Sequence, residues 1–138
     1  MQLSINGDVS DPPVSTDLIA RTVASFADTD DFFLILAKDE MTYIQTSGSA
    51  KSGFVLEYQD GSIEEHFSCA DAPLNVEQIV ETLQRYLTGH DRWKSEFTWE
   101  KQELGSTPHQ TNVNARTILS VIGITVAGIA VWWYLTAA

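Results

Sequence analysis

The chain reads FFLILAKDEMTYIQTSGSAKSGFVLEYQDGSIEEHFSC from Phe32 to Cys69, and this stretch decides its fold. Phe32–Ala37 is a continuous apolar run, which is typical of a strand covered on both faces. In Phe54–Gln59 apolar and polar side chains alternate, as in a strand with one buried face. Glycine accepts the backbone of a tight hairpin, so a two-residue turn is expected at Asp60 and Gly61. The stretch therefore predicts an antiparallel meander.

The remaining expected strands follow from the same patterns. The meander has a strand at Met41–Thr46 and a returning strand that ends at Cys69. Alternation in the returning strand predicts one shared face, made of Ile63, Glu65, Phe67 and Cys69. Outside the meander, Gln2–Asn6 is expected to form a short strand and Trp93–Leu104 an edge strand.

Two helices are expected beside the meander. The first begins near Ser15, because Val14 and Ile19 have the spacing of a hydrophobic staple. The second begins at Asn75, where Gln78 completes a capping-box pattern. It ends at Gly89. The inner stripe of the first helix is Leu18, Ile19, Thr22, Val23 and Phe26; that of the second is Val76, Ile79, Val80, Leu83, Tyr86 and Leu87.

These elements predict an α+β fold over residues 1–104, an antiparallel β-meander packed with two helices. A flexible polar linker is expected at 105–116, since GSTPHQTNVNA (Gly105–Ala115) has no charged side chain and contains Gly105 and Pro108. Thr117–Ala138, TILSVIGITVAGIAVWWYLTAA, contains no Asp, Glu, Lys, Arg or His. About 20 apolar residues cross a bilayer, so one C-terminal transmembrane helix is expected at 117–138.

The membrane topology is inferred from the segments that flank the tail and from the N-terminus. MQLSINGDVSDPP (Met1–Pro13) has no basic region and no apolar core, so it is not expected to be a signal peptide. Arg116 precedes the tail, and positive side chains favour the cytoplasmic side. The prediction is a single-pass C-terminal anchor with the acidic domain in the cytoplasm.

The charge of the domain limits its partners. All 19 acidic residues and 7 of the 8 basic ones lie at or before Glu103, so the domain carries a formal charge of 7 − 19 = −12. Phosphate backbones repel such a surface, so we do not expect nucleic-acid binding. A basic protein would be attracted. The alternative is that the charge only keeps the domain soluble.

The chemistry-bearing residues do not form a catalytic pattern in the sequence. Cys69 and His66 are three residues apart on one strand, where they face opposite sides. Glu65 is expected on an apolar face that is half covered. The histidines and the acidic run before Phe32 lack the spacing of metal sites; these residues are His66, His90, His109, Asp28, Asp30 and Asp31. We expect no enzyme activity, no cofactor and no metal.

Two features favour binding. Trp93, Phe97 and Trp99 are interleaved with charged residues, as anchors of protein interfaces often are. The alternative is that they cap the core from an edge strand. In the tail, small residues form one helical stripe that permits close helix packing in lipid, as a homo-oligomer or with another protein. The stripe is Ser120, Gly123, Ala127 and Ala130.

Two stretches, GFVLEYQDG (Gly53–Gly61) and YLTGHDRWKSEFTWE (Tyr86–Glu100), resemble small bacterial immunity proteins that neutralise partner toxins, particularly deaminase-type toxins. The resemblance covers about 32–104. It implies an α+β domain that binds a toxin without catalysis of its own, in a bacterium and hence at the inner membrane. The positions it implies as contacts are Glu57, Tyr58, Asp60, Trp93 and Trp99.

The leading hypothesis is a membrane-tethered, non-catalytic protein-binding module, an immunity protein that binds and neutralises a basic toxin. The alternative is a small accessory subunit of a membrane complex, assembled with a membrane-embedded protein through the transmembrane helix. A third hypothesis is an enzyme whose site the sequence does not reveal.

Overall fold

The computed structural model describes residues 1–103 except 12, 27, 30 and 31. These residues belong to the first of two units, Met1–Leu104. The linker expected at 105–116 and the transmembrane helix expected at 117–138 lie outside the described residues. Within the part of the chain that is described, no helix combines the length and the apolar character needed to cross a bilayer.

The first unit is built on a seven-stranded antiparallel sheet with the order β2-β1-β3-β4-β5-β6-β7. Its strands are β1 Gln2–Ile5, β2 Asp8–Val9, β3 Phe32–Asp39, β4 Thr42–Ser49, β5 Gly53–Asp60, β6 His66–Cys69 and β7 Trp99–Lys101. Its helices are α1 Thr16–Phe26, α2 Val76–Thr88 and α3 Arg92–Glu96, with a 3-10 turn η1 at Ile63–Glu65. The α+β class and the meander of β3, β4, β5 and β6 are confirmed.

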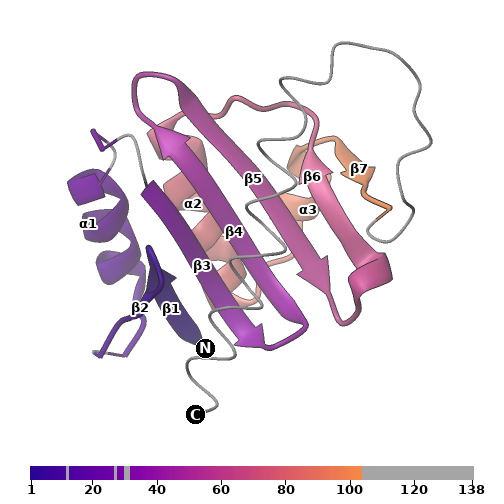
Figure 1. Ribbon diagram of the computed structural model, residues 1–138, viewed down its shortest axis with the longest axis horizontal. Coiled ribbons are helices and arrows are strands. Elements are labelled where there is room, and N and C mark those ends of the chain that lie inside the picture. The colour runs from indigo at the N-terminus through magenta and orange to yellow at the C-terminus, as the bar shows by residue number, and fades with distance from the viewer. Residues whose placement is uncertain (12, 27, 30–31, 104–138) are drawn as a thin grey trace. The chain divides into compact units, whose positions relative to one another are not determined.

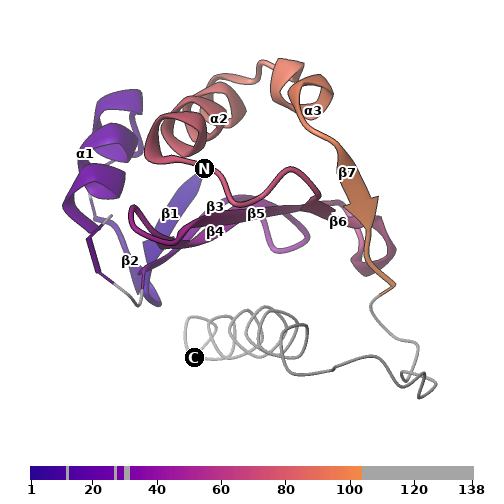
Figure 2. The same cartoon turned by 90° about the horizontal axis from the view of Figure 1, so that it is seen from above.

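The three helices lie on one face of the sheet (Figure 2). The core lies between them and the strands, where Leu36 pairs with Ile44 and Ile44 with Tyr58 across β3, β4 and β5. Ile79 and Leu83 of α2 are fully buried against this face. Burial of such side chains stabilises a fold by about 1.5–3 kcal/mol each, so this contact fixes which face of the meander is the core.

The helix boundaries agree with the predicted caps. The amide of Gln78 donates to the side chain of Asn75 at 2.9 Å, and the amide of Asn75 donates back to the side chain of Gln78 at 3.0 Å. The amide of Leu18 donates to Ser15 Oγ at 3.0 Å, which starts α1 one residue later. Gly89 ends α2 in a left-handed conformation.

The predicted two-residue turn at Asp60 and Gly61 is wrong. β5 continues to Asp60 and β6 begins at His66, which pairs with Gln59, so residues 61–65 separate the two strands. The turn η1 fills this connection, because the amide of Glu65 donates to the carbonyl of Ser62 at 3.1 Å. Glu65 is therefore outside β6 and Ile63 is exposed, which leaves Phe67 and Cys69 as the pair on the core face.

The edge strand expected over Trp93–Leu104 is only partly correct. Its first half is the short helix α3, and the strand β7 begins at Trp99. The helical turn places Trp93 in the core at 2% exposure. Strand β2 was not predicted, although Asn6 and Gly7 between Ile5 and Asp8 form a typical hairpin signal.

Gly48 and Gly61 allow a matched test of the meander. Both have positive φ, at 132° and 86°, but a Cβ on Gly48 would lie 2.3 Å from the carbonyl oxygen of Gly53, whereas at Gly61 nothing lies within 4 Å. Gly61→Ala carries backbone strain alone, about 1–2 kcal/mol, and Gly48→Ala adds a clash with β5. We expect Gly48→Ala to lower the free energy of unfolding by about 2 kcal/mol more than Gly61→Ala, as measured by urea denaturation. Equal losses would contradict the described β4–β5 approach.

Candidate functional site

The aromatic residues singled out in the sequence form one cluster at the β6–β7 end of the core. The ring of Tyr58 on β5 lies 4.9 Å from Phe67, 5.0 Å from Trp93 and 4.7 Å from Trp99, measured between centroids. Trp93 and Trp99 contact each other edge to face at 5.7 Å. Such pairs each contribute about 0.5–1.5 kcal/mol beyond the area that they bury. The cluster therefore attaches α3 and β7 to the sheet.

Local hydrogen bonds hold the tryptophan-rich segment in this position. Trp99 Nε1 donates to the carbonyl of Lys94 at 3.0 Å, which links the start of β7 to α3. The amide of Thr98 donates to the carboxylate of Asp71 at 2.6 Å. Pairing of Trp99 with Cys69 then adds β7 to the sheet. These contacts thus hold the segment in place on both sides of the junction between α3 and β7.

Charged side chains border the cluster. Lys94 Nζ lies 3.0 Å from the Asp60 carboxylate and 5.5 Å from the centre of the Tyr58 ring. Lys101 pairs with Glu65 at 2.5 Å. These exposed or half-exposed pairs stabilise the fold by less than about 1 kcal/mol each. Burial raises the pKa of Tyr58, an effect that Asp60 increases and Lys94 opposes.

The structure separates the six predicted contact residues into two places. Tyr58 and Trp93 are buried at 8% and 2% exposure, whereas Phe97 and Trp99 are half-buried at the edge of the cluster. Asp60 is exposed beside it. Glu57 points to the other face of the sheet, since it precedes Tyr58 on β5. The predicted stripe of Ser120, Gly123, Ala127 and Ala130 lies outside the described residues.

Glu57 belongs to a polar cluster that the sequence analysis did not identify. Gln45 Nε2 donates to Glu57 Oε2 at 2.6 Å, and His66 Nε2 lies 3.7 Å from the same oxygen. Next to them Tyr43 OH donates to Gln59 Oε1 at 3.2 Å. These five polar side chains are all buried. Alternation in both β4 and β5 places their polar positions opposite each other, and reading the two strands together would have shown it.

Cys69, the nucleophile considered from the sequence, is a buried core residue in the structure. Cys69 lies in the core cluster on the face opposite His66, as the strand period predicted. Burial raises the pKa of its thiol, and this disfavours the reactive thiolate. Among residues 1–103 as described, no three His, Cys, Asp or Glu side chains are grouped so that they could hold a metal ion.

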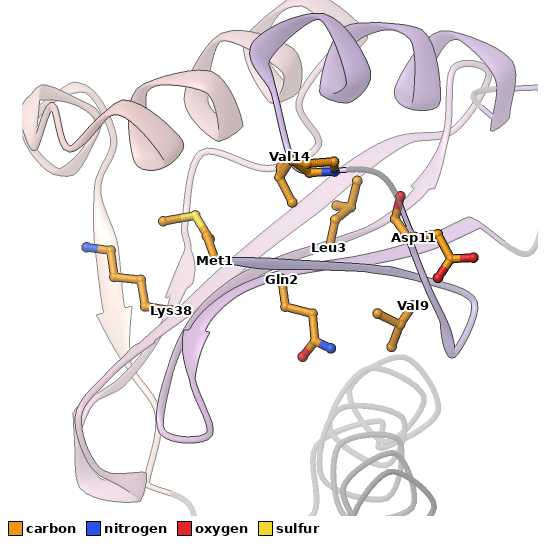
Figure 3. Close-up of a pocket in the computed structure, with 9 residues that line it drawn as sticks. Met1, Gln2, Leu3, Val9, Asp11, Val14 and Lys38 are labelled. Atoms are coloured by element: carbon orange, nitrogen blue, oxygen red, sulfur yellow. The ribbon is translucent and has the colours of Figure 1, made fainter.

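A shallow hollow lies along the outer part of β1 (Figure 3). Leu3 and Val14 lie on one side of the strand, whereas Gln2 and Val9 lie on the other. The polar groups do not converge on a common point, and convergent polar groups are what fix the orientation of a small ligand. The hollow therefore offers less specific chemistry than the polar cluster at Glu57.

Comparison of the chain with protein-family models, curated proteins and solved structures finds no match. The resemblance of Gly53–Gly61 and Tyr86–Glu100 to immunity proteins therefore stays a prediction.

The buried tyrosines predict a loss of stability in alkali. Burial raises the pKa of Tyr43, with the charge of Glu57 adding to the effect, and burial is also the main cause for Tyr58 and Tyr86. In the unfolded chain each phenol ionises near pH 10, so above that pH unfolding releases protons and becomes more favourable. Below about pH 10 this contribution is fully present, and it is lost as the pH rises towards the folded-state pKa.

The expected result is a fall of the urea midpoint between about pH 10 and 11.5, with a smaller slope for Tyr43→Phe. Tyrosinate absorbance should show delayed ionisation of these three phenols in the folded chain. Ionisation of all three near pH 10 without unfolding would contradict the described burial.

Proposed function

We propose that this protein is a membrane-tethered, non-catalytic protein-binding module, and that it acts as an immunity protein that binds and neutralises a basic toxin. The acidic domain recognises the toxin, while the apolar segment at 117–138 anchors it to the bacterial inner membrane with the domain in the cytoplasm. The resemblance of Gly53–Gly61 and Tyr86–Glu100 to immunity proteins supports the toxin as the partner.

The distribution of charge is the observation on which the proposal depends. Five of the seven basic side chains at or before Glu103 are already in ion pairs within the domain: Arg21, Arg85, Arg92, Lys94 and Lys101. Exposed acidic side chains without an ion pair among the described residues cover several elements; they are Asp8, Asp11, Asp28, Asp39, Glu40, Glu64, Asp71, Glu77, Asp91 and Glu100. The surface therefore attracts a basic protein over long range.

The positions of the reactive side chains also favour binding over catalysis. Cys69 packs in the core, and the aromatic cluster uses its rings to hold α3 and β7. A protein that acts by covering its partner needs a large, stable surface rather than a reactive group. Exposed acidic side chains on several elements, among them Asp8 on β2, Glu77 on α2 and Glu100 on β7, provide part of such a surface.

Partner capture tests the proposal. The full-length chain, extracted in mild detergent, is compared with a chain ending at Leu104, and the bound proteins are identified by mass spectrometry. We expect both forms to retain one basic toxin, with an association rate that falls as salt rises. The purified partner should lose its toxicity when the full-length chain is added.

Two outcomes contradict the proposal. A binding rate that does not change between about 0.05 and 0.5 M salt would remove the electrostatic account. A stoichiometric membrane protein retained only by the full-length chain would instead favour the accessory-subunit function, with association through the segment that contains Gly123 and Ala127.

A further inference from the structure

We propose that Asn6 is a site of spontaneous chemical modification: it converts to isoaspartate when the β1–β2 hairpin opens, and the product then keeps β2 from pairing again. This modification does not depend on the partner that the domain binds. Of the four asparagines in the chain, Asn6 alone is followed by a glycine, Gly7. The side chain of the residue after an asparagine hinders its cyclisation, and glycine has no side chain.

The reaction is an attack of a backbone nitrogen on the neighbouring side chain. The amide nitrogen of Gly7 loses its proton to hydroxide and bonds to Cγ of Asn6, and the side-chain nitrogen leaves as ammonia. Water then opens the resulting succinimide ring. Opening at Cγ gives aspartate, whereas opening at the backbone carbonyl carbon gives isoaspartate, in which the main chain runs through Cβ and Cγ. The conversion consumes one water and releases one ammonia, so it needs no oxidant and no enzyme.

The turn between β1 and β2 leaves the reacting groups accessible to water. Asn6, Gly7 and Asp8 are all exposed. The amide of Gly7 donates no backbone hydrogen bond to another described residue, so no such bond has to break before this nitrogen loses its proton. A Cβ at Gly7 would meet nothing within 4 Å, and this open space leaves room for the ring to form.

The closed hairpin holds Asn6 in a conformation that opposes cyclisation. Its φ is 50°, in the left-handed region, where ψ is also positive, at about 47°. Such a ψ turns the nitrogen of Gly7 away from Cγ, whereas a five-membered ring needs these two atoms on the same side of the Cα–C bond. The amide of Phe33 also donates to Oδ1 of Asn6 at 2.8 Å, which fixes the side chain. The reaction therefore requires the turn to open first.

The structure of β2 makes this opening easy. The strand has two residues, and within the described sheet it pairs with β1 alone, Ser4 with Val9 and Ile5 with Asp8. It lies at the edge of the sheet, and both of its residues are exposed (Figure 1). Short edge elements open locally at a free energy well below that of global unfolding. The hairpin therefore opens many times while the rest of the domain stays folded.

Isoaspartate prevents the hairpin from closing again. It adds one main-chain carbon to the two-residue turn between Ile5 and Asp8, and turns of this length accept few backbone geometries. The former Oδ1 becomes a main-chain carbonyl oxygen, so the amide of Phe33 loses its acceptor. β1 then replaces β2 as the edge of the sheet. Aspartate, by contrast, keeps both the chain length and the acceptor, so it leaves the hairpin intact.

Ageing of the full-length chain in detergent micelles at mildly alkaline pH tests the site. The tryptic peptides 1–21 and 52–85 contain Asn6 and Asn75, and mass spectrometry with electron-transfer fragmentation separates isoaspartate from aspartate in each. We expect isoaspartate to accumulate at Asn6, about tenfold more slowly than in the chain unfolded in urea. Asn75, which caps α2 and precedes Val76, should stay unmodified. No isoaspartate at Asn6 in the folded chain, or equal rates with and without urea, would overturn the proposal.

Val9→Gly and Ile63→Gly form a matched pair of variants that tests the role of hairpin opening. Both replace an exposed β-branched residue, at 39% and 50% exposure, but only Val9 belongs to the hairpin. Because glycine is a poor strand former, Val9→Gly should raise the rate at Asn6 in the folded chain about threefold to fivefold, and Ile63→Gly less than about 1.5-fold. Both should match the original sequence in urea. Equal rates in the two folded variants would contradict control by the hairpin.

Asn6→Asp is the control for the effect of the modification on the hairpin. The variant has the same additional negative charge as the isoaspartate form purified from the aged chain, but not its longer main chain. Hydrogen exchange is measured at the amide of Ser10, which donates to the carbonyl of Leu3 at 2.9 Å, and at the amide of Phe33. We expect exchange about tenfold or more faster in the isoaspartate form, and less than about twofold faster in Asn6→Asp. Equal protection in the two forms would overturn the proposal.

Discussion

The two-residue period of β5 is the constraint on which the rest of the structure depends. Phe54, Leu56 and Tyr58 point to the helices, and Val55, Glu57 and Gln59 point to the other side. A shift of one residue in register would exchange these two sets, and a carboxylate would enter the core. The apolar set fixes the register, and the register in turn fixes the polar set. The site at Glu57 is thus positioned by side chains that it does not touch.

Tyr58 connects the fold to its C-terminal elements. Its ring pairs with Phe67 on the neighbouring strand and contacts the indoles of Trp93 and Trp99. These contacts hold α3 over one end of the sheet, next to the edge strand β7, so the helical layer extends past α2 (Figure 2). Packing on the helix side of the sheet is therefore continuous from α2 to α3, and the rings of Trp93, Phe97 and Trp99 all contribute to it. The two faces of the sheet consequently differ in kind: one packs apolar side chains under the helices, and the other carries buried polar side chains on its central strands.

Much of the fold was predictable because its signals are local. The capping box at Asn75 and Gln78 and the alternation in Phe54–Gln59 act within a few residues, and the structure contains both. The two-residue turn at Asp60 and Gly61 was mispredicted, because a glycine also permits the longer connection through η1 that joins β5 to β6. The helix α3 was missed because its stability comes from the burial of Trp93 against distant strands.

The candidate site was predictable only in part, for a related reason. Glu57 was singled out through a resemblance, but its partners Gln45 and His66 lie on other strands, and only the register brings them to one carboxylate. A sequence read strand by strand shows polar residues at each place without showing that they meet. The aromatic residues led to a different error. Because charged residues are interleaved with Trp93, Phe97 and Trp99, the sequence resembled an exposed interface, but in the structure these rings pack towards the core.

The two edges of the sheet have a consequence for how the protein behaves when crowded. β2 is Asp8–Val9 and β7 is Trp99–Lys101, so each edge offers few free backbone groups, and charged side chains accompany them. Short, charged edges discourage strands of separate molecules from joining into extended sheets. The described edges therefore disfavour polymerisation through the sheet even where many copies of the chain are crowded together.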